Sequence, residues 1–200
     1  MPNEQEILNS NFIIACQEND FKRAKQLLEK GADVNAMDEF TNRPALVEVV
    51  FNENKDILNL LIQNGADVNK RESSSGVTPL MYAVMLHYSR LDCEKRKEIA
   101  KILIQNGADI EARDHAGRTV LMLALEYSYG KEDMIGLLLE HGADMHSKLI
   151  FGKEVVTPLS IAKKMPYKNI TALFETKPAQ IVSSKKNVMA PKKMHENEKS

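Results

Sequence analysis

The sequence predicts an all-α solenoid, a stack of helix-turn-helix units. The tripeptide Gly-Ala-Asp occurs four times, and these copies contain four of the nine glycines in the 200-residue chain. Each copy directly follows an apolar run with helical character. A motif that recurs in this way indicates a repeat architecture, in which each unit buries its apolar surface against its neighbours.

The second helix of each unit is predicted to end at the glycine of Gly-Ala-Asp. Glycine adopts the left-handed C-cap conformation without a steric penalty, so it fixes the position of the helix end. The four glycines are Gly31, Gly65, Gly107 and Gly142. Runs such as Leu60-Leu61-Ile62 and Leu137-Leu138-Leu139 precede them and supply the apolar surface of these helices.

The first helix of each unit is predicted to begin near a threonine. Thr78-Pro79-Leu80 and Thr157-Pro158-Leu159 combine an N-cap residue with proline at the first helical position, and Thr119 keeps the cap without the proline. Counting 19 residues back from the first two Gly-Ala-Asp motifs gives Phe12 and Leu46. The five starts, at positions 12, 46, 80, 121 and 159, are therefore 34, 34, 41 and 38 residues apart.

This unit resembles the ankyrin repeat, whose pattern is Thr-Pro-Leu-His-x-Ala, a leucine-rich second helix, Gly-Ala-Asp and a β-hairpin finger. Residues 31–35 and 65–69 are both Gly-Ala-Asp-Val-Asn, and residues 114–119 match the family's finger. The resemblance covers residues 12–174 and implies an ankyrin-repeat solenoid with β-hairpin fingers. The family's histidine after leucine is absent from all five starts, so we expect apolar packing to replace some hydrogen bonds between repeats.

We expect the ankyrin repeat domain to occupy residues 1–176. Its five units lie near residues 4–38, 39–72, 73–114, 115–150 and 151–176, and the first and last are expected to act as caps with polar outer surfaces. The third unit has eight extra residues between its helices, within residues 87–96. This insertion either lengthens both helices or forms a protruding loop.

Residues 177–200 form a basic tail, which we expect to be disordered. The tail contains six Lys and two Glu and carries +4, which leaves −5 on residues 1–176 because the whole chain carries −1. Lys185-Lys186 and residues 191–193 also match a weak nuclear address, and the polar C-terminus weakly resembles that of bacterial secreted effectors.

The composition excludes several classes of partner. With 27 basic and 28 acidic side chains, the chain lacks the excess positive charge that nucleic acids require. We find no signal peptide and no apolar run of the roughly 18 residues that cross a membrane. We therefore expect no nucleic-acid binding, no membrane insertion and a monomeric cytoplasmic protein, with the nucleus or secretion into a host cell as alternative destinations.

No catalytic, cofactor or metal site is predicted. The repeated aspartates Asp33, Asp67, Asp109 and Asp144 recur at structural hairpin positions, and the five histidines have no ligand spacing typical of zinc sites. Cys16 replaces a small inner-helix residue, so we expect it to be buried, whereas Cys93 lies in the insertion and is expected to be exposed. We therefore expect a protein that is not an enzyme and that has no cofactor.

The resemblance implies a partner surface along the concave face and the finger tips. The ends of the first helices are rich in Phe, Met and Tyr, residue types that are enriched at interface cores. The candidate partner-binding residues are Phe51, Asn52, Met85, Tyr88, Arg113, His115, Glu126, Tyr127, Tyr129, Leu149 and Phe151. The apolar segment Leu149-Ile150-Phe151 on the last finger has two interpretations, packing against the capping unit or anchoring a partner.

The leading functional hypothesis is a protein-interaction module that binds a protein or peptide of unknown identity. Its fingers carry charges of both signs and no continuous basic strip, which suits a protein partner better than a polyanion. An alternative is a bacterial secreted effector that masks a host protein through the same surface, with the tail as its secretion address.

Overall fold

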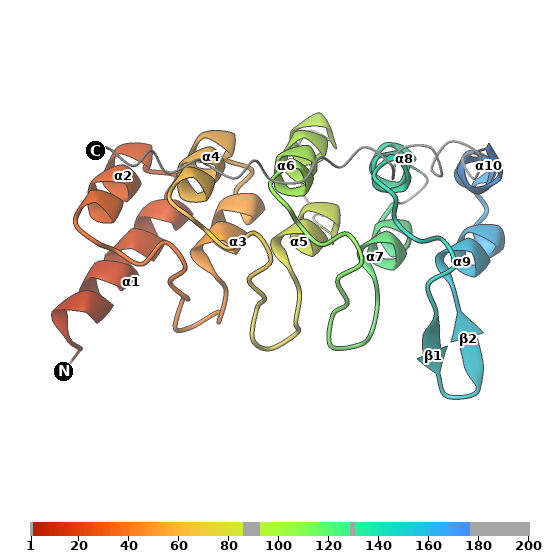
Figure 1. Ribbon diagram of the computed structural model, residues 1–200, viewed down its shortest axis with the longest axis horizontal. Helices are drawn as coiled ribbons and strands as arrows, with labels where there is room; N and C mark the ends of the chain where they lie inside the picture. Colours follow the sequence, from red (N-terminus) through yellow and green to blue (C-terminus); the bar gives the residue numbers. More distant parts are fainter. Residues whose placement is uncertain (1, 86–92, 129–130, 177–200) are drawn as a thin grey trace, which may run out of the picture.

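The computed structural model describes residues 2–85, 93–128 and 131–176. Its helices form two parallel rows, and the connecting fingers all project from one side of the stack (Figure 1). The inner helices are α1 (Glu4–Gln17), α3 (Ala45–Phe51), α5 (Pro79–Met85), α7 (Val120–Glu126) and α9 (Pro158–Lys164). The outer helices are α2 (Phe21–Glu29), α4 (Lys55–Gln63), α6 (Cys93–Gln105), α8 (Asp133–Glu140) and α10 (Lys168–Thr176).

The predicted threonine caps at helix N-termini and glycine caps at helix C-termini are both present. The Thr119 hydroxyl accepts a hydrogen bond from the Met122 amide at 3.3 Å, and Thr157 caps α9 in the same way. All four Gly-Ala-Asp glycines have positive φ, between 83° and 92°. The helix boundaries therefore follow from local backbone preferences.

The core is one continuous cluster that runs along the stack. Phe12, Leu46, Leu80 and Leu121, the predicted first apolar residues of successive inner helices, are each at most 2% exposed. Adjacent inner helices pack side by side from α1 to α9. Each unit thus buries its apolar surface against its neighbours, as expected for a solenoid.

The first helix begins earlier than the apolar pattern indicated. The pattern starts at Phe12, but α1 begins at Glu4, where Asn3 and Glu6 form a reciprocal capping box. The extra turns are structural, because Asn9 accepts from the Asp33 amide at 2.9 Å and Gln5 donates to the Gly31 carbonyl at 3.1 Å. In this way α1 supplies the polar contacts that a preceding finger provides to later units.

Four fingers connect the units, and we call residues 32–44, 66–78, 108–119 and 143–157 the first to fourth fingers. Only the fourth contains paired strands among the described residues, namely β1 (Leu149–Phe151) antiparallel to β2 (Glu154–Val156). The first and third fingers have single bridges, Met37 with Pro44 and Arg113 with Thr119. The predicted hairpin geometry is therefore complete in the fourth finger, which is the longest.

The insertion in the third unit contributes to the outer helix. Helix α6 has 13 residues, against nine in α4. Residues 86–92, which include most of the insertion and Tyr88, lie outside the described residues, as do the basic tail at 177–200 and Tyr129. No described helix is both long enough and apolar enough to span a bilayer.

Candidate functional site

The last turns of neighbouring inner helices bring four candidate residues to one edge of the inner row. Phe51, Met85 and Glu126 are the last residues of α3, α5 and α7, and Tyr127 follows Glu126 directly. Phe51 is 46% exposed, and Met85 and Tyr127 are half-buried. Because α5 packs against both α3 and α7, these side chains form one strip, which we call the inner-helix strip.

Arg43 of the first finger stacks between two aromatic rings at one end of this strip. Its guanidinium carbon lies 5.5 Å from the centroid of the Phe51 ring and 5.3 Å from that of Tyr82. Such cation–π contacts restrict the position of an exposed ring. Phe51 is therefore held in place with one side still open to solvent.

Two buried carboxyl groups near Arg43, those of Glu48 and Glu72, have pKa values shifted in opposite directions. Burial raises the pKa of Glu48, although the Thr41 hydroxyl donates to it and the Arg43 guanidinium lies 4.0 Å from its Oε1. Burial also acts on Glu72, but hydrogen bonds from Tyr82, Ser75 and Ser74, at 2.6 to 2.7 Å, lower its pKa below the ordinary value. Three hydroxyl donors therefore favour the charged form of Glu72.

Arg118 of the third finger pairs with two carboxylates. Its Nε donates to Asp114 at 2.8 Å, and its Nη1 donates to Glu126 at 3.0 Å. Both carboxylates raise the pKa of Arg118 above its usual value, against the effect of burial. Glu126, a candidate partner contact, is half exposed and already belongs to this network.

Two further candidates, Asn52 and Arg113, already make hydrogen bonds within the protein. The Asn52 amide donates to the Gln17 carbonyl at 2.9 Å and so satisfies the end of α1. Arg113 donates to the carbonyls of Gly117 and Lys148, at 2.8 and 3.1 Å, and thereby links the third and fourth fingers. These hydrogen bonds give Asn52 and Arg113 a structural role. Contact of either residue with a partner stays a prediction.

His115 links the second and third fingers. Its amide donates to the Ser75 carbonyl at 2.8 Å, and its ring Nδ1 lies 3.1 Å from the Ser74 carbonyl oxygen. The ring also covers Gly76, where an added Cβ would overlap the imidazole. Glycine is therefore required at position 76 both for its φ of +70° and for this close approach.

The hairpin divides its apolar residues between two environments. Leu149 is half-buried and lies over Gly117 of the preceding finger, where an added Cβ would come within 2.9 Å of its Cδ1. Ile150, on the other face of the strand, is 73% exposed, and its cross-strand partner Val155 is 56% exposed. Leu149 thus packs on the preceding finger, which neither interpretation described, whereas Ile150 is open to solvent. Anchoring of a partner by this segment stays a prediction. Phe151 is the last residue of β1.

Sequence reasoning missed Phe40 at the tip of the first finger, which is 94% exposed. Its signal was a single aromatic residue between the polar residues of a predicted finger, Glu39 and Thr41. It also missed Arg43 as the residue that orients Phe51, because their contact depends on packing between a finger and a helix end.

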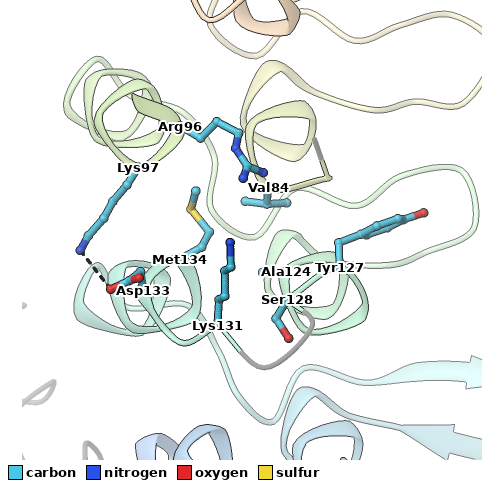
Figure 2. Close-up of a pocket in the computed structure, with 9 residues that line it drawn as sticks. All are labelled: Val84, Arg96, Lys97, Ala124, Tyr127, Ser128, Lys131, Asp133 and Met134. Atoms are coloured by element: carbon cyan, nitrogen blue, oxygen red, sulfur yellow. Dashed lines mark ion pairs between the residues drawn. The ribbon is translucent and has the colours of Figure 1, made fainter. Parts of the chain in front are cut away.

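A small pocket opens between α5 and α6 on one side and α7 and α8 on the other (Figure 2). Figure 2 shows Arg96, Lys131 and Met134 directed into it, while Lys97 pairs with Asp133 at 3.6 Å at its edge. The pocket holds about 40 Å³, enough for a few water molecules. Within the described part of the chain, no three His, Cys, Asp or Glu residues are grouped as a metal site would require.

Comparison with known sequences agrees with this geometry. A family model described as ankyrin repeats (3 copies) matches residues 12–114 and 85–149. The chain belongs to the ankyrin repeat family. Ankyrin repeats generally act as protein–protein interaction modules, and the family is generally non-enzymatic.

Similar ankyrin repeat proteins come from distant organisms. Ankyrin repeat and SOCS box protein 6 of Homo sapiens is 36% identical over 153 residues, which are 74% of this chain and 35% of that protein. Putative ankyrin repeat protein YahD of Escherichia coli (strain K12) is 23% identical over 195 residues, covering 84% of this chain and 95% of YahD.

A third relative is named as an enzyme. The 2-5A-dependent ribonuclease of Mus musculus is 41% identical over 75 residues, covering 38% of this chain and 10% of that protein. This ankyrin repeat chain thus spans about a tenth of the ribonuclease and about a third of the human protein. The similarity to each covers only these shares of their lengths.

Proposed function

We propose that this chain is a non-enzymatic binding module that captures a protein or peptide partner on the inner-helix strip. The observation that carries the proposal is the half-exposed ring of Phe51, held by Arg43 at 5.5 Å. A preorganised aromatic side chain loses little conformational freedom on binding, so most of the free energy from its burial contributes to affinity.

The neighbouring residues support the same role. Met85 and Tyr127 extend the apolar surface along the next two inner helices, and Met and Tyr are enriched at interface cores. Glu126 and Arg118 add a charged pair beside Tyr127, at 3.0 Å, which suits a polar rim. The strip therefore combines apolar anchors with a charged border.

The experiment is affinity capture with the full chain, followed by titration of the identified partner. Phe51→Ala, Met85→Ala and Tyr127→Ala are each expected to weaken binding, by about thirtyfold at a true hot spot. Phe21→Ala is the matched control, because Phe21 is 43% exposed on outer helix α2. Circular dichroism of each variant establishes that the fold is retained. If every strip variant binds as the control does, the assignment of this surface is wrong.

The effector hypothesis uses the same surface and differs in the role given to residues 177–200, which lie outside the described residues. Deleting these residues and measuring export from a bacterial host tests it. Unchanged export would remove the reason for that hypothesis, whereas binding by the inner-helix strip would stand.

A further inference from the structure

Large exposed apolar side chains lie at the tip of the first finger and one strand pair before the turn of the fourth. Phe40 lies at the tip of the first finger and is 94% exposed. Ile150 and Val155 face each other across the fourth-finger hairpin and are 73% and 56% exposed. Among the described residues, the second and third fingers have no large apolar side chain exposed in this way. The apolar tips thus stand at opposite ends of one row.

The Phe40 tip is a defined structure. The Asp38 carboxylate accepts hydrogen bonds from the amides of Phe40 and Thr41, at 3.0 and 2.6 Å. The Asn42 amide donates to the Asp38 carbonyl at 2.9 Å, with Asn42 in the left-handed region at φ +54°. These bonds hold the turn that presents Phe40, so burying its ring requires little additional ordering.

The two apolar tips carry opposite exposed charges. Glu39 precedes Phe40 and is exposed. The fourth-finger hairpin carries the exposed side chains of Lys148, Lys153 and Glu154, so its exposed charges sum to +1. A surface that carries Glu39 beside Phe40 is therefore complementary to one that carries Lys153 beside Ile150 and Val155.

The finger lengths are complementary as well. In the view of Figure 1 the first finger projects least from the helices, the second and third project further, and the β1–β2 hairpin extends beyond the others. If the finger row of a second copy faces that of the first in reverse order, the fourth finger of each copy lies opposite the first finger of the other. The middle tips would then bring Ser73 and Ser74 of one copy opposite Ala116 and the exposed His115 of the other.

We propose that the occupant of these tips is a second copy of this chain. Two copies associate in antiparallel fashion, finger row against finger row, about a twofold axis. Phe40 of each copy packs on Ile150 and Val155 of the other, and Glu39 faces Lys153, so that every contact is made twice, as an isologous interface requires. The proposal departs from the monomer expected from the sequence.

The dimer goes beyond the proposed function because it uses different residues. The inner-helix strip, with Phe51 as its anchor, lies at the ends of the inner helices and not on the finger tips. Because only the tips meet, we expect an interface smaller than the roughly 1,600 Å² of standard complexes. The association should therefore be weak and depend on protein concentration.

Sedimentation equilibrium of the full chain over a hundredfold concentration range tests the proposal. The expected result is a reversible monomer–dimer equilibrium. Phe40→Ser and Ile150→Ser should each weaken dimerisation by at least about tenfold, because each change removes two symmetry-related contacts. Phe21→Ser, an exposed aromatic residue on α2, serves as the control and should dimerise as the unmodified chain does. Phe51→Ala should dimerise normally too, which separates this test from that of the inner-helix strip.

Charge exchange provides a second, independent readout. Glu39→Lys and Lys153→Glu should each weaken the dimer, and the double variant should restore it, because the exchanged charges face each other again. A chain that sediments as a monomer at every concentration would overturn the proposal. So would equal losses in Phe40→Ser and Phe21→Ser, or a monomer whose Phe40 instead contributes to capture of a different protein.

Discussion

The side chain of Asn69 bridges its own finger to the end of the next outer helix. Its Oδ1 accepts from the Asp109 amide at 2.8 Å, and its Nδ2 donates to the Gly107 carbonyl at 3.0 Å. Asn35 makes the same pair of contacts one repeat earlier, with Asp67 and Gly65. The Gly-Ala-Asp-Val-Asn motif therefore encodes both the end of one helix and its link to the next repeat.

Asn69→Ala should destabilise the stack by about 1–2 kcal/mol, because it leaves both partners in the next repeat without their hydrogen bonds. The measurement is urea denaturation followed by circular dichroism. Asn59→Ala is the matched control, since Asn59 is exposed on α4 and should change stability by no more than about 0.5 kcal/mol. Equal stability of the two variants would show that the bridge contributes nothing.

Replacement of Gly107, which follows α6, should destabilise the fold through its backbone conformation alone. Gly107 has φ +89°, and no atom lies within 4 Å of a Cβ added there. Gly107→Ala should therefore lose about 1 kcal/mol through the left-handed conformation and not through a clash. Gly107→Asn should lose less, because asparagine tolerates this conformation. Thermal denaturation of both variants checks the order, and an alanine variant as stable as the unmodified chain would contradict it.

The two buried carboxyl groups, those of Glu72 and Glu48, should make the free energy of unfolding depend on pH in opposite directions. The folded-state pKa of Glu72 is lowered, so Glu72 stabilises the fold above its unfolded pKa, and this contribution is lost as the pH falls through the folded pKa. The folded-state pKa of Glu48 is raised, so its contribution is present below the unfolded pKa and is lost as the pH rises through the folded pKa.

Glu72→Gln should accordingly be less stable than the unmodified chain at pH 7, by about 1–3 kcal/mol, and the difference should shrink below about pH 4. Glu48→Gln should gain stability relative to the unmodified chain as the pH rises from 4 to 7. Urea midpoints measured at several pH values test both trends. Parallel pH profiles for the two variants would contradict the assigned pKa directions.

Cys16 should be inert to thiol reagents in the folded protein. It is fully buried on α1, and burial, with a smaller contribution from the charge of Glu48, raises the pKa of its thiol to about 12. In a Cys93→Ser background, labelling at pH 8 should occur only when the chain unfolds, and should therefore accelerate in urea. Fast labelling of the native protein would show that α1 opens independently of the stack.

Much of the fold could be predicted from single positions. The expected helix ends at Gly31, Gly65, Gly107 and Gly142 are confirmed, because a residue with positive φ carries its signal locally. The buried environment of Cys16 was likewise predictable from its place in a repeated pattern. The predicted start of α1, at Phe12, was wrong by eight residues. The first turns of this helix are stabilised by polar contacts to the Gly31 region and not by a repeated apolar pattern.

The candidate site was less predictable than the fold. The sequence placed Phe51 and Met85 at the ends of inner helices, and there the structure finds them. It did not distinguish them from Asn52 and Arg113, whose polar groups bond to neighbouring repeats. Residue type alone does not tell whether a polar side chain is already engaged, because its partners lie about 35 residues away in sequence.

The sequence by itself determined the repeat, the register of its helices and the family, because glycine caps, threonine caps and apolar spacing act through the local backbone. Only the tertiary structure decided which side chains remain available. Arg43 reaches Phe51 and Tyr82, and Phe40 stays open, because finger and helix positions are set jointly by packing between repeats. Which surface side chains stay exposed depends on that packing, because the atoms that would cover them belong to other repeats.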